Sequence, residues 1–298
     1  MSLLPVGDDI TACLLQRAVH EATTRLYLLF EDSDSSLSKQ LLCRIGKALS
    51  VVAAERPCLD VVPLLHWAGW SNEKVAALPD LTTLLQHETP PPTSARLCEA
   101  LQQARPANMS KLNIAQLHCT PQYGQQAGDL FERSLAPAQA ADYNFEHVAV
   151  GGTFDRLHAG HRMLLAATAL ACTLHVYIGL TSDQLLQKKQ HRELLQSYDD
   201  RRSAAISYMQ AVRPGLHISG GALTDPKEPT AAATEEGMQA LVVSEETVPG
   251  AAAINQDRGR RGFAELTIIV VDTMGSTRSG AGGDKLSSTL LRAHEFGS

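Results

Sequence analysis

The sequence lacks the features that mark membrane, secreted and zinc-binding proteins. It has no run of 18 apolar residues, and its start, MSLLPVGDD, has neither the basic segment of a signal peptide nor the arginines of a transit peptide. Its six cysteines form no CxxC pair and no zinc-ligand spacing. We therefore expect a cytoplasmic protein without a membrane span, whose cysteines are reduced and buried.

An excess of positive charge is also missing. Lys and Arg total 26 against 32 Asp and Glu, a formal net charge of -6. This balance argues against a general partner of nucleic acid or of a membrane surface, although a local basic site is compatible with it. Hydrophobic residues make up 44% of the 298 residues, so the chain can bury a core, and its length suggests about two domains.

Two halves meet near residue 140. The stretch 135–141, LAPAQAA, is small and uncharged and contains a proline, which suits a linker. We predict an N-terminal domain over 1–140 and a second domain over 141–294, and we find no internal repeat. The last four residues, EFGS, resemble a cloning scar and are left out of the fold.

Both halves alternate between helix and strand patterns. In the first half we predict helices at 9–22, 37–54 and about 94–104, with strands at 25–30 and 59–65. In the second half we predict strands at 145–150, 174–179, 240–244 and 266–271, with helices at 160–171 and 199–212. The fold class is therefore α/β, with a parallel sheet in the second half and a smaller α/β domain before it. Ligands of such sheets lie at the carboxyl ends of strands.

One loop at such an end stands out. Residues 151–161, GGTFDRLHAGH, run from a predicted strand into a predicted helix. Two glycines allow close approach of a ligand, and the free N–H groups of a helix start favour an anion. His158 and His161 flank the helix start and can donate to phosphate oxygens. The loop resembles the T/HxGH signature of the nucleotidyltransferase superfamily, in which it binds a nucleotide triphosphate.

Three further segments resemble one family within that superfamily, the eukaryotic-type phosphopantetheine adenylyltransferase. They are DQLLQKKQHRELLQSY at 183–198, VVSEETVPGAAAIN at 242–255 and DKLSSTLLR at 284–292. The resemblance covers about residues 143–293 and implies a Rossmann-like nucleotidyltransferase domain. Gln187 and Gln256 stand where relatives often carry a basic residue.

The resemblance implies a set of functional residues. We expect His161, Lys189 and Thr153 to be catalytic. We expect the substrates to be bound by Gly151, Gly152, Phe154, His158, Lys188, Arg201, Glu245, Asn255, Arg258, Ser287, Ser288 and Thr289. From the residues alone, a solvated charge pair at 188–189, a simple helix cap at 287–289 and a surface helix arginine at 201 are the alternatives.

The implied reaction is adenylyl transfer from ATP to 4'-phosphopantetheine, which gives dephospho-CoA and pyrophosphate. Mg²⁺ would enter with ATP and be held through phosphates and water, with no protein metal site. The alternatives are another nucleotidyltransferase, such as a cytidylyltransferase, and a non-catalytic nucleotide-binding protein. The DKLSST segment counts against the cytidylyltransferase, which typically has an RTxGISTT-like end. We find no GxxxxGK[ST] P-loop, so we expect no additional kinase activity.

The first half loosely resembles the N-terminal region of animal CoA synthase. It has no GxFDxxHxGH loop and no SST segment, so we expect it to hold none of the catalytic groups. Our hypothesis for this half is a degenerate copy of the nucleotidyltransferase fold with a regulatory, interaction or targeting role.

Overall fold

A computed structural model describes residues 1–7, 11–30, 35–118, 142–187, 189, 191–225 and 227–271. The first half contains β1 (Ser2–Val6), α1 (Ala12–Glu21), β2 (Arg25–Phe30), α2 (Lys39–Glu55), β3 (Asp60–Leu64), η1 (His66–Ala68), α3 (Asn72–Ala76), β4 (Thr83–His87), α4 (Pro92–Ala104) and β5 (Asn113–Leu117). The second half contains β6 (Phe145–Gly152), α6 (Ala159–Ala171), β7 (Cys172–Thr181), η3 (Arg192–Leu194), α7 (Tyr198–Val212), β8 (His217–Leu223), α8 (Ala231–Thr234), β9 (Ala240–Ser244), η4 (Glu245–Thr247), α9 (Val248–Arg261) and β10 (Thr267–Val271).

Each half is built on its own five-stranded sheet. The strand orders are β3-β2-β1-β4-β5 and β10-β9-β6-β7-β8, and the paired strands named here run parallel. Counted along the chain within each half, both orders are 3-2-1-4-5. The predicted Rossmann-like α/β fold is therefore confirmed, and the two halves share one topology although we found no repeat in the sequence. The predicted domain boundary near residue 140 lies outside the described residues.

Apolar runs explain the strands that the sequence analysis found. The strands at Arg25–Phe30 and Ala240–Ser244 have the predicted bounds, and nearly every residue in them is buried. Helix α1 begins at a Thr11 cap, whose hydroxyl accepts from the Leu14 N–H at 3.2 Å. Helix α2 begins in the same way at Ser38.

Of the described cysteines, Cys13, Cys98 and Cys172 are buried, while Cys43 is half-buried and Cys58 is exposed.

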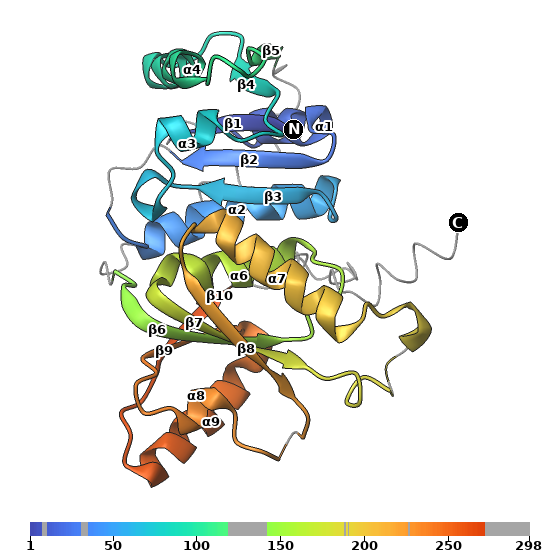
Figure 1. The fold of residues 1–298 in the computed structure, drawn as a ribbon, viewed down its shortest axis with the longest axis vertical. Helices are drawn as coiled ribbons and strands as arrows, with labels where there is room; N and C mark the ends of the chain where they lie inside the picture. The colour runs from blue at the N-terminus through green and yellow to red at the C-terminus, as the bar shows by residue number, and fades with distance from the viewer. Residues whose placement is uncertain are drawn as a thin grey trace.

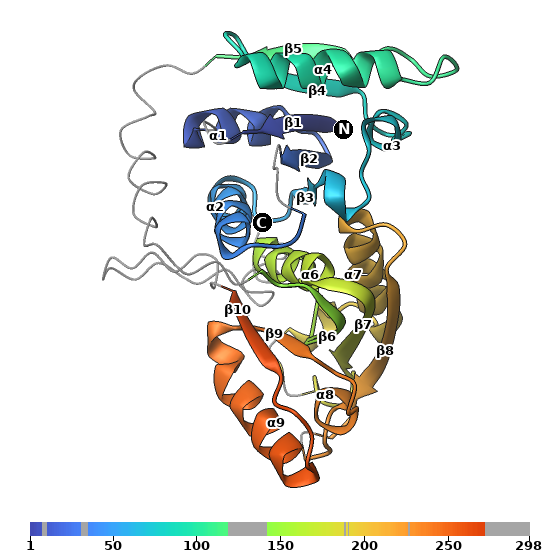
Figure 2. The ribbon, with the colours of Figure 1, turned by 90° about the vertical axis from the view of Figure 1, so that its left-hand side faces the viewer.

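The two halves pack against each other through helices α2, α6 and α7 and strand β3. Figures 1 and 2 show α6 lying between β3 and α2 on one side and the second sheet on the other. Eleven of the 13 residues of α6 are buried, as expected for a helix covered on opposite faces. One continuous apolar core therefore joins the two sheets.

Hydrogen bonds reinforce this junction. β3 is an edge strand, and the Tyr208 hydroxyl on α7 donates to the Val61 carbonyl of β3 at 2.9 Å. One turn further along α7, at its C-terminus, the Trp70 indole N–H lies 3.0 Å and 3.1 Å from the carbonyls of Ala211 and Val212. The halves are thus joined along the C-terminal end of α7, and an otherwise open sheet edge is covered.

Candidate active site

The carboxyl ends of the second sheet bring the predicted loops to one edge. Gly152 pairs with Leu180, and Val271 pairs with Ser244. Because Val150 pairs with Val242, Gly152 and Ser244 lie at the same level on neighbouring strands. The chain reverses its winding between β6 and β9, which is where open α/β sheets bind ligands.

The loop after β6 has a strained backbone. Phe154 and Arg156 have φ values of 52° and 44°, in the left-handed region that residues other than glycine rarely adopt. Between them, the buried Asp155 carboxylate accepts the Gln196 N–H at 3.0 Å, and the Arg156 N–H donates to the Gln196 side chain at 2.7 Å. Such strain persists only where the surroundings hold it, and it is typical of functional loops.

The two predicted histidines meet at the start of α6. His158 is the N-cap residue, and its ring stacks on the His161 ring with 3.9 Å between centroids. Phe154 supports the pair, with its ring centroid 5.5 Å from that of His161. Nδ1 of His161 is buried and has no hydrogen-bond partner of good geometry among the described residues. An enclosed polar atom at this edge is suited to a ligand.

Burial lowers the pKa of His161 well below its usual 6.5, and the charges of His158, Lys189 and Arg162 lower it further. A hydrogen bond with the Arg156 backbone raises this pKa, but by less than burial lowers it. His161 is therefore neutral near pH 7 and can donate one N–H. The effect of Lys189 also places its charge within electrostatic reach of His161, so the structure brings together three residues predicted to be functional.

Several other predicted residues lie at or near this edge. Gly151, Gly152 and Thr153 end β6 and open the loop. A side chain at Gly152 would place its Cβ only 3.0 Å from the Phe154 ring, so any other residue here would crowd that ring. Glu245 begins the short turn η4 directly after β9, and it is exposed. Lys188 and Ser287–Thr289 lie outside the described residues.

Four of the predicted binding residues make structural contacts, and their predicted contact with a ligand stays a prediction. The Phe154 side chain is fully buried beneath Gly152 and supports the loop. The Arg201 side chain is 0% exposed, so it is not a surface helix residue either. It donates to the carbonyls of Thr153, Thr181 and Gln196 and to Asp183, and so ties together the loops that follow β6 and β7. Both side chains therefore support the loops of the site.

Asn255 and Arg258 lie at the opposite end of the sheet. The Asn255 amide bonds both the N–H and the carbonyl of Leu266, which precedes the first residue of β10. Arg258 is fully buried and donates to the carbonyls of Ala232, Glu235, Glu236, Met238 and Ala264. Their side-chain donors are thus used about 16 Å from the carboxyl edge, measured along a five-residue strand. This geometry gives no support to substrate binding by the two residues, which stays a prediction.

A cleft of about 400 Å³ lies next to the predicted substrate segment at 183–198. Its lining includes Asp183, Arg192 and Gln196. Sequence reasoning missed the roles of Asp155 and Gln196, although a charged residue in a loop after a strand was a usable signal for Asp155. It also missed Arg162, whose charge acts on His161 from within the helix.

Comparisons with known proteins define the class and then the family. A family model described as cytidylyltransferase-like matches residues 149–294. The phosphopantetheine adenylyltransferase of Saccharomyces cerevisiae is 37% identical over 152 residues, which cover 51% of this chain and 49% of the yeast protein. The enzymes of that name from Pyrococcus furiosus and Pyrococcus horikoshii are 36% and 37% identical, and the matches cover 50% of this chain and 88% and 89% of theirs.

The fold, the loop and these matches assign the second half to the nucleotidyltransferase class of proteins. Through its second half, the chain belongs to the phosphopantetheine adenylyltransferase family. The match spans about half the length of the yeast relative and most of the length of the archaeal ones. Within the part of the chain that the structure describes, no helix is both long and apolar enough to span a membrane.

Proposed function

We propose that the second half transfers the adenylyl group of ATP to 4'-phosphopantetheine, giving dephospho-CoA and pyrophosphate. The observation that carries the proposal is the stacked pair His158 and His161 at the start of α6, directly beyond the glycine end of β6. It offers imidazole groups and free helix N–H groups at one place, as a triphosphate requires. The names of the relatives supply the identity of the substrates.

The reaction needs no covalent intermediate on the protein. An oxygen of the phosphopantetheine phosphate forms a bond to the α-phosphorus of ATP, while the bond from that phosphorus to the bridging oxygen breaks and pyrophosphate leaves. The protein contributes position and charge stabilisation. We assign donation to the phosphates to His158 and His161, orientation of the phosphate under attack to Thr153, and charge neutralisation to Lys189.

Mg²⁺ is proposed to arrive with ATP. Among the described residues no group of three or more His, Cys, Asp and Glu could hold a metal ion, and the Asp155 carboxylate is occupied by Gln196. This donor set fits an ion held mainly by phosphates and water, which is common for Mg²⁺. The ion would neutralise phosphate charge, and Lys188 and Ser287–Thr289 are proposed to join the same phosphates.

The test is an assay of the purified chain with ATP, Mg²⁺ and 4'-phosphopantetheine. We expect equal amounts of pyrophosphate and dephospho-CoA, the latter identified by mass spectrometry. Replacing ATP with CTP should abolish the product, because the family assignment is to an adenylyltransferase. Turnover with CTP alone would establish a cytidylyltransferase, and ATP binding without turnover would establish a non-catalytic nucleotide-binding protein.

A further inference from the structure

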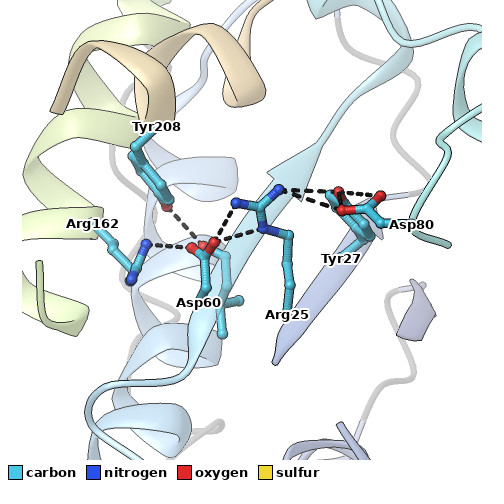
Figure 3. Close-up of polar contacts among 7 residues, drawn as sticks. Arg25, Tyr27, Asp60, Asp80, Arg162 and Tyr208 are labelled. Carbon is cyan, nitrogen blue, oxygen red and sulfur yellow. Dashed lines mark hydrogen bonds and ion pairs between the residues drawn. The ribbon is translucent and has the colours of Figure 1, made fainter. Parts of the chain in front are cut away.

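A buried ion pair connects the first half of the chain to the helix that carries the two histidines. Arg162 follows His161 directly, and its side chain is about one-tenth exposed, at 9%. Its guanidinium forms an ion pair with Asp60 at the start of β3 and lies over the Tyr208 ring, 5.2 Å from the centroid. Figure 3 shows Arg162 and Tyr208 approaching Asp60 from the second half, and Arg25 approaching from the first.

Asp60 is shared between two arginines. Arg25 Nε and Nη2 lie 2.6 Å and 2.5 Å from one oxygen of the Asp60 carboxylate, and Arg162 bonds the other oxygen. Arg25 also contacts the Tyr27 hydroxyl at 3.3 Å and Asp80 at 3.8 Å. One carboxylate of the first half therefore holds one cation from each half, and loss of either cation leaves Asp60 with a partner.

The backbone of Arg162 belongs to the same turn as the histidines. Its N–H donates to the His158 carbonyl at 3.0 Å, in the first hydrogen bond of the helix. The position of the Arg162 side chain thus bears on the first turn of α6, where both imidazole rings are attached. Nearby, α6 packs on α2, and Met163 lies against Gly46 of that helix. The described contacts of the first half thus reach the helix that carries the two histidines through Asp60 and α2.

We propose that Arg162 is a positioning residue, through which Asp60 of the first half holds the first turn of α6 and the His158–His161 pair in the geometry for adenylyl transfer. This rests on the proposed function. The alternative is an ion pair with a structural role only. Apolar replacement of such buried pairs is often neutral or stabilising. Arg162 differs from such a pair because it contributes charge to the environment of His161, together with His158 and Lys189.

The experiment compares Arg162→Met with Arg25→Met in the full chain. Each variant removes one cation from Asp60 and leaves the other in place, so the two are matched in charge. We expect Arg162→Met to lower kcat on the order of 10- to 100-fold, since small displacements of catalytic groups have effects of this size. Arg25→Met should keep kcat within about twofold, because it leaves the contact with α6 intact. Arg162→Lys should recover part of the lost activity, because it keeps the charge but not the planar fork of donors.

A second measurement detects what a structural role would not change. Imidazole NMR, with the His161 signal assigned from its loss in His161→Gln, follows the titration of that ring. Arg162→Met should raise the pKa of His161, because it removes a positive charge that lowers it. Arg25→Met should leave that titration unchanged.

The outcomes are distinct. Equal losses of kcat in the two variants, or an unchanged kcat and His161 titration in Arg162→Met, would overturn the positioning role. If the wild-type chain makes no dephospho-CoA, the proposed function fails. The NMR titration still decides whether Arg162 sets the environment of His161, and an unchanged titration then overturns the inference.

Discussion

The two halves of the chain have the same strand order and place different residues at the same point of it. In the first half the chain reverses its winding between β1 and β4, and in the second half between β6 and β9. In the helix after the first strand, the N-cap position is Thr11 in α1 and His158 in α6, and the third helical residue is Leu14 and His161, respectively. The backbone position is equivalent, and only one half carries imidazoles there.

The first half has a cavity at its own reversal point. It measures about 210 Å³ and is lined by the ends of β1 and β4 and the starts of α1 and α4. Pro5 lacks an N–H, and the pairing of β1 with β4 stops at Leu3, so the strands separate where the cavity opens. Thr11, Leu14 and His87 are among the described lining residues, which include no lysine or arginine. The comparison teaches that the topology sets where a ligand can bind, while the side chains set whether it can be a phosphate.

The strongest way to break this comparison is to separate the halves. We expect a chain that begins at Asp142 to aggregate or to unfold, because α6 is apolar on the side that packs against α2 and β3. Co-expression of residues 1–141 and 142–298 should restore a soluble one-to-one complex with activity. Size-exclusion chromatography and the dephospho-CoA assay check both.

The archaeal relatives give a reason to expect the opposite result for the shortened chain. Half of this chain matches 88% of the Pyrococcus furiosus protein, which is named phosphopantetheine adenylyltransferase. The shortened chain would contradict our prediction if it were monomeric, folded cooperatively and kept its activity within a few-fold. The first half would then be an independent addition, and the shared core would contribute little to the stability of the second half.

The second prediction tests the chemical difference directly. His161→Ala should lower turnover on the order of 100-fold or more with the fold intact, by analogy with loss of one transition-state donor. Leu14→Ala changes the equivalent position of the first half and should leave turnover within about twofold. Steady-state kinetics compare the turnover of the two variants, and circular dichroism checks that both are folded. Near wild-type turnover of His161→Ala would remove it from the catalytic role.

Much of the fold could be predicted, and the misses have physical reasons. Continuous apolar runs identified β2 and β9 with their bounds. Strand β1 was missed because Pro5 interrupts a short run, and β8 because Gly220 and Gly221 weaken its pattern. Helix α9 was not predicted, although Pro249 lies in its first turn, where proline is well tolerated.

The site was predictable where one local segment carries it. The loop at 151–161 contains its glycines and histidines within a few residues, so pattern alone located it. Arg201 and Arg258 have the residue type of a phosphate ligand, but tertiary contacts use their donors on backbone carbonyls. Asp60 could not be predicted at all, because it meets Arg162 across 102 positions of sequence.

The third prediction sharpens the account of the catalytic edge. Lys189→Ala should lower turnover about tenfold, and more than Lys188→Ala, because the charge of Lys189 acts on His161. Pyrophosphate release with saturating substrates measures the difference. Equal, mild effects would indicate a solvated pair of charges, and a larger effect at Lys188 would mean that the family register is shifted by one residue.

The smallest expected effect concerns the pH dependence of stability. The folded chain holds the pKa of His161 well below 6.5, chiefly by burial, whereas the unfolded chain titrates near 6.5. Between these two values only the unfolded state gains a proton at this residue, so stability falls as the pH is lowered through 6.5 toward the depressed pKa. Below the depressed pKa both states are protonated and the loss ends.

His161→Gln should therefore lose less stability than the wild type over that interval, while the two behave alike above pH 7.5. His175, whose pKa is also lowered by burial and by His217 and His147, is present in both proteins and cancels in the difference. Leu14→Gln, at the equivalent position of the first half, should keep the wild-type pH dependence. Urea unfolding at pH values from 5 to 8 measures all three chains. An identical pH dependence of the wild type and His161→Gln would show that the ring is not held neutral by its surroundings, and the chemical contrast between the two helix starts would then rest on the imidazole donors alone.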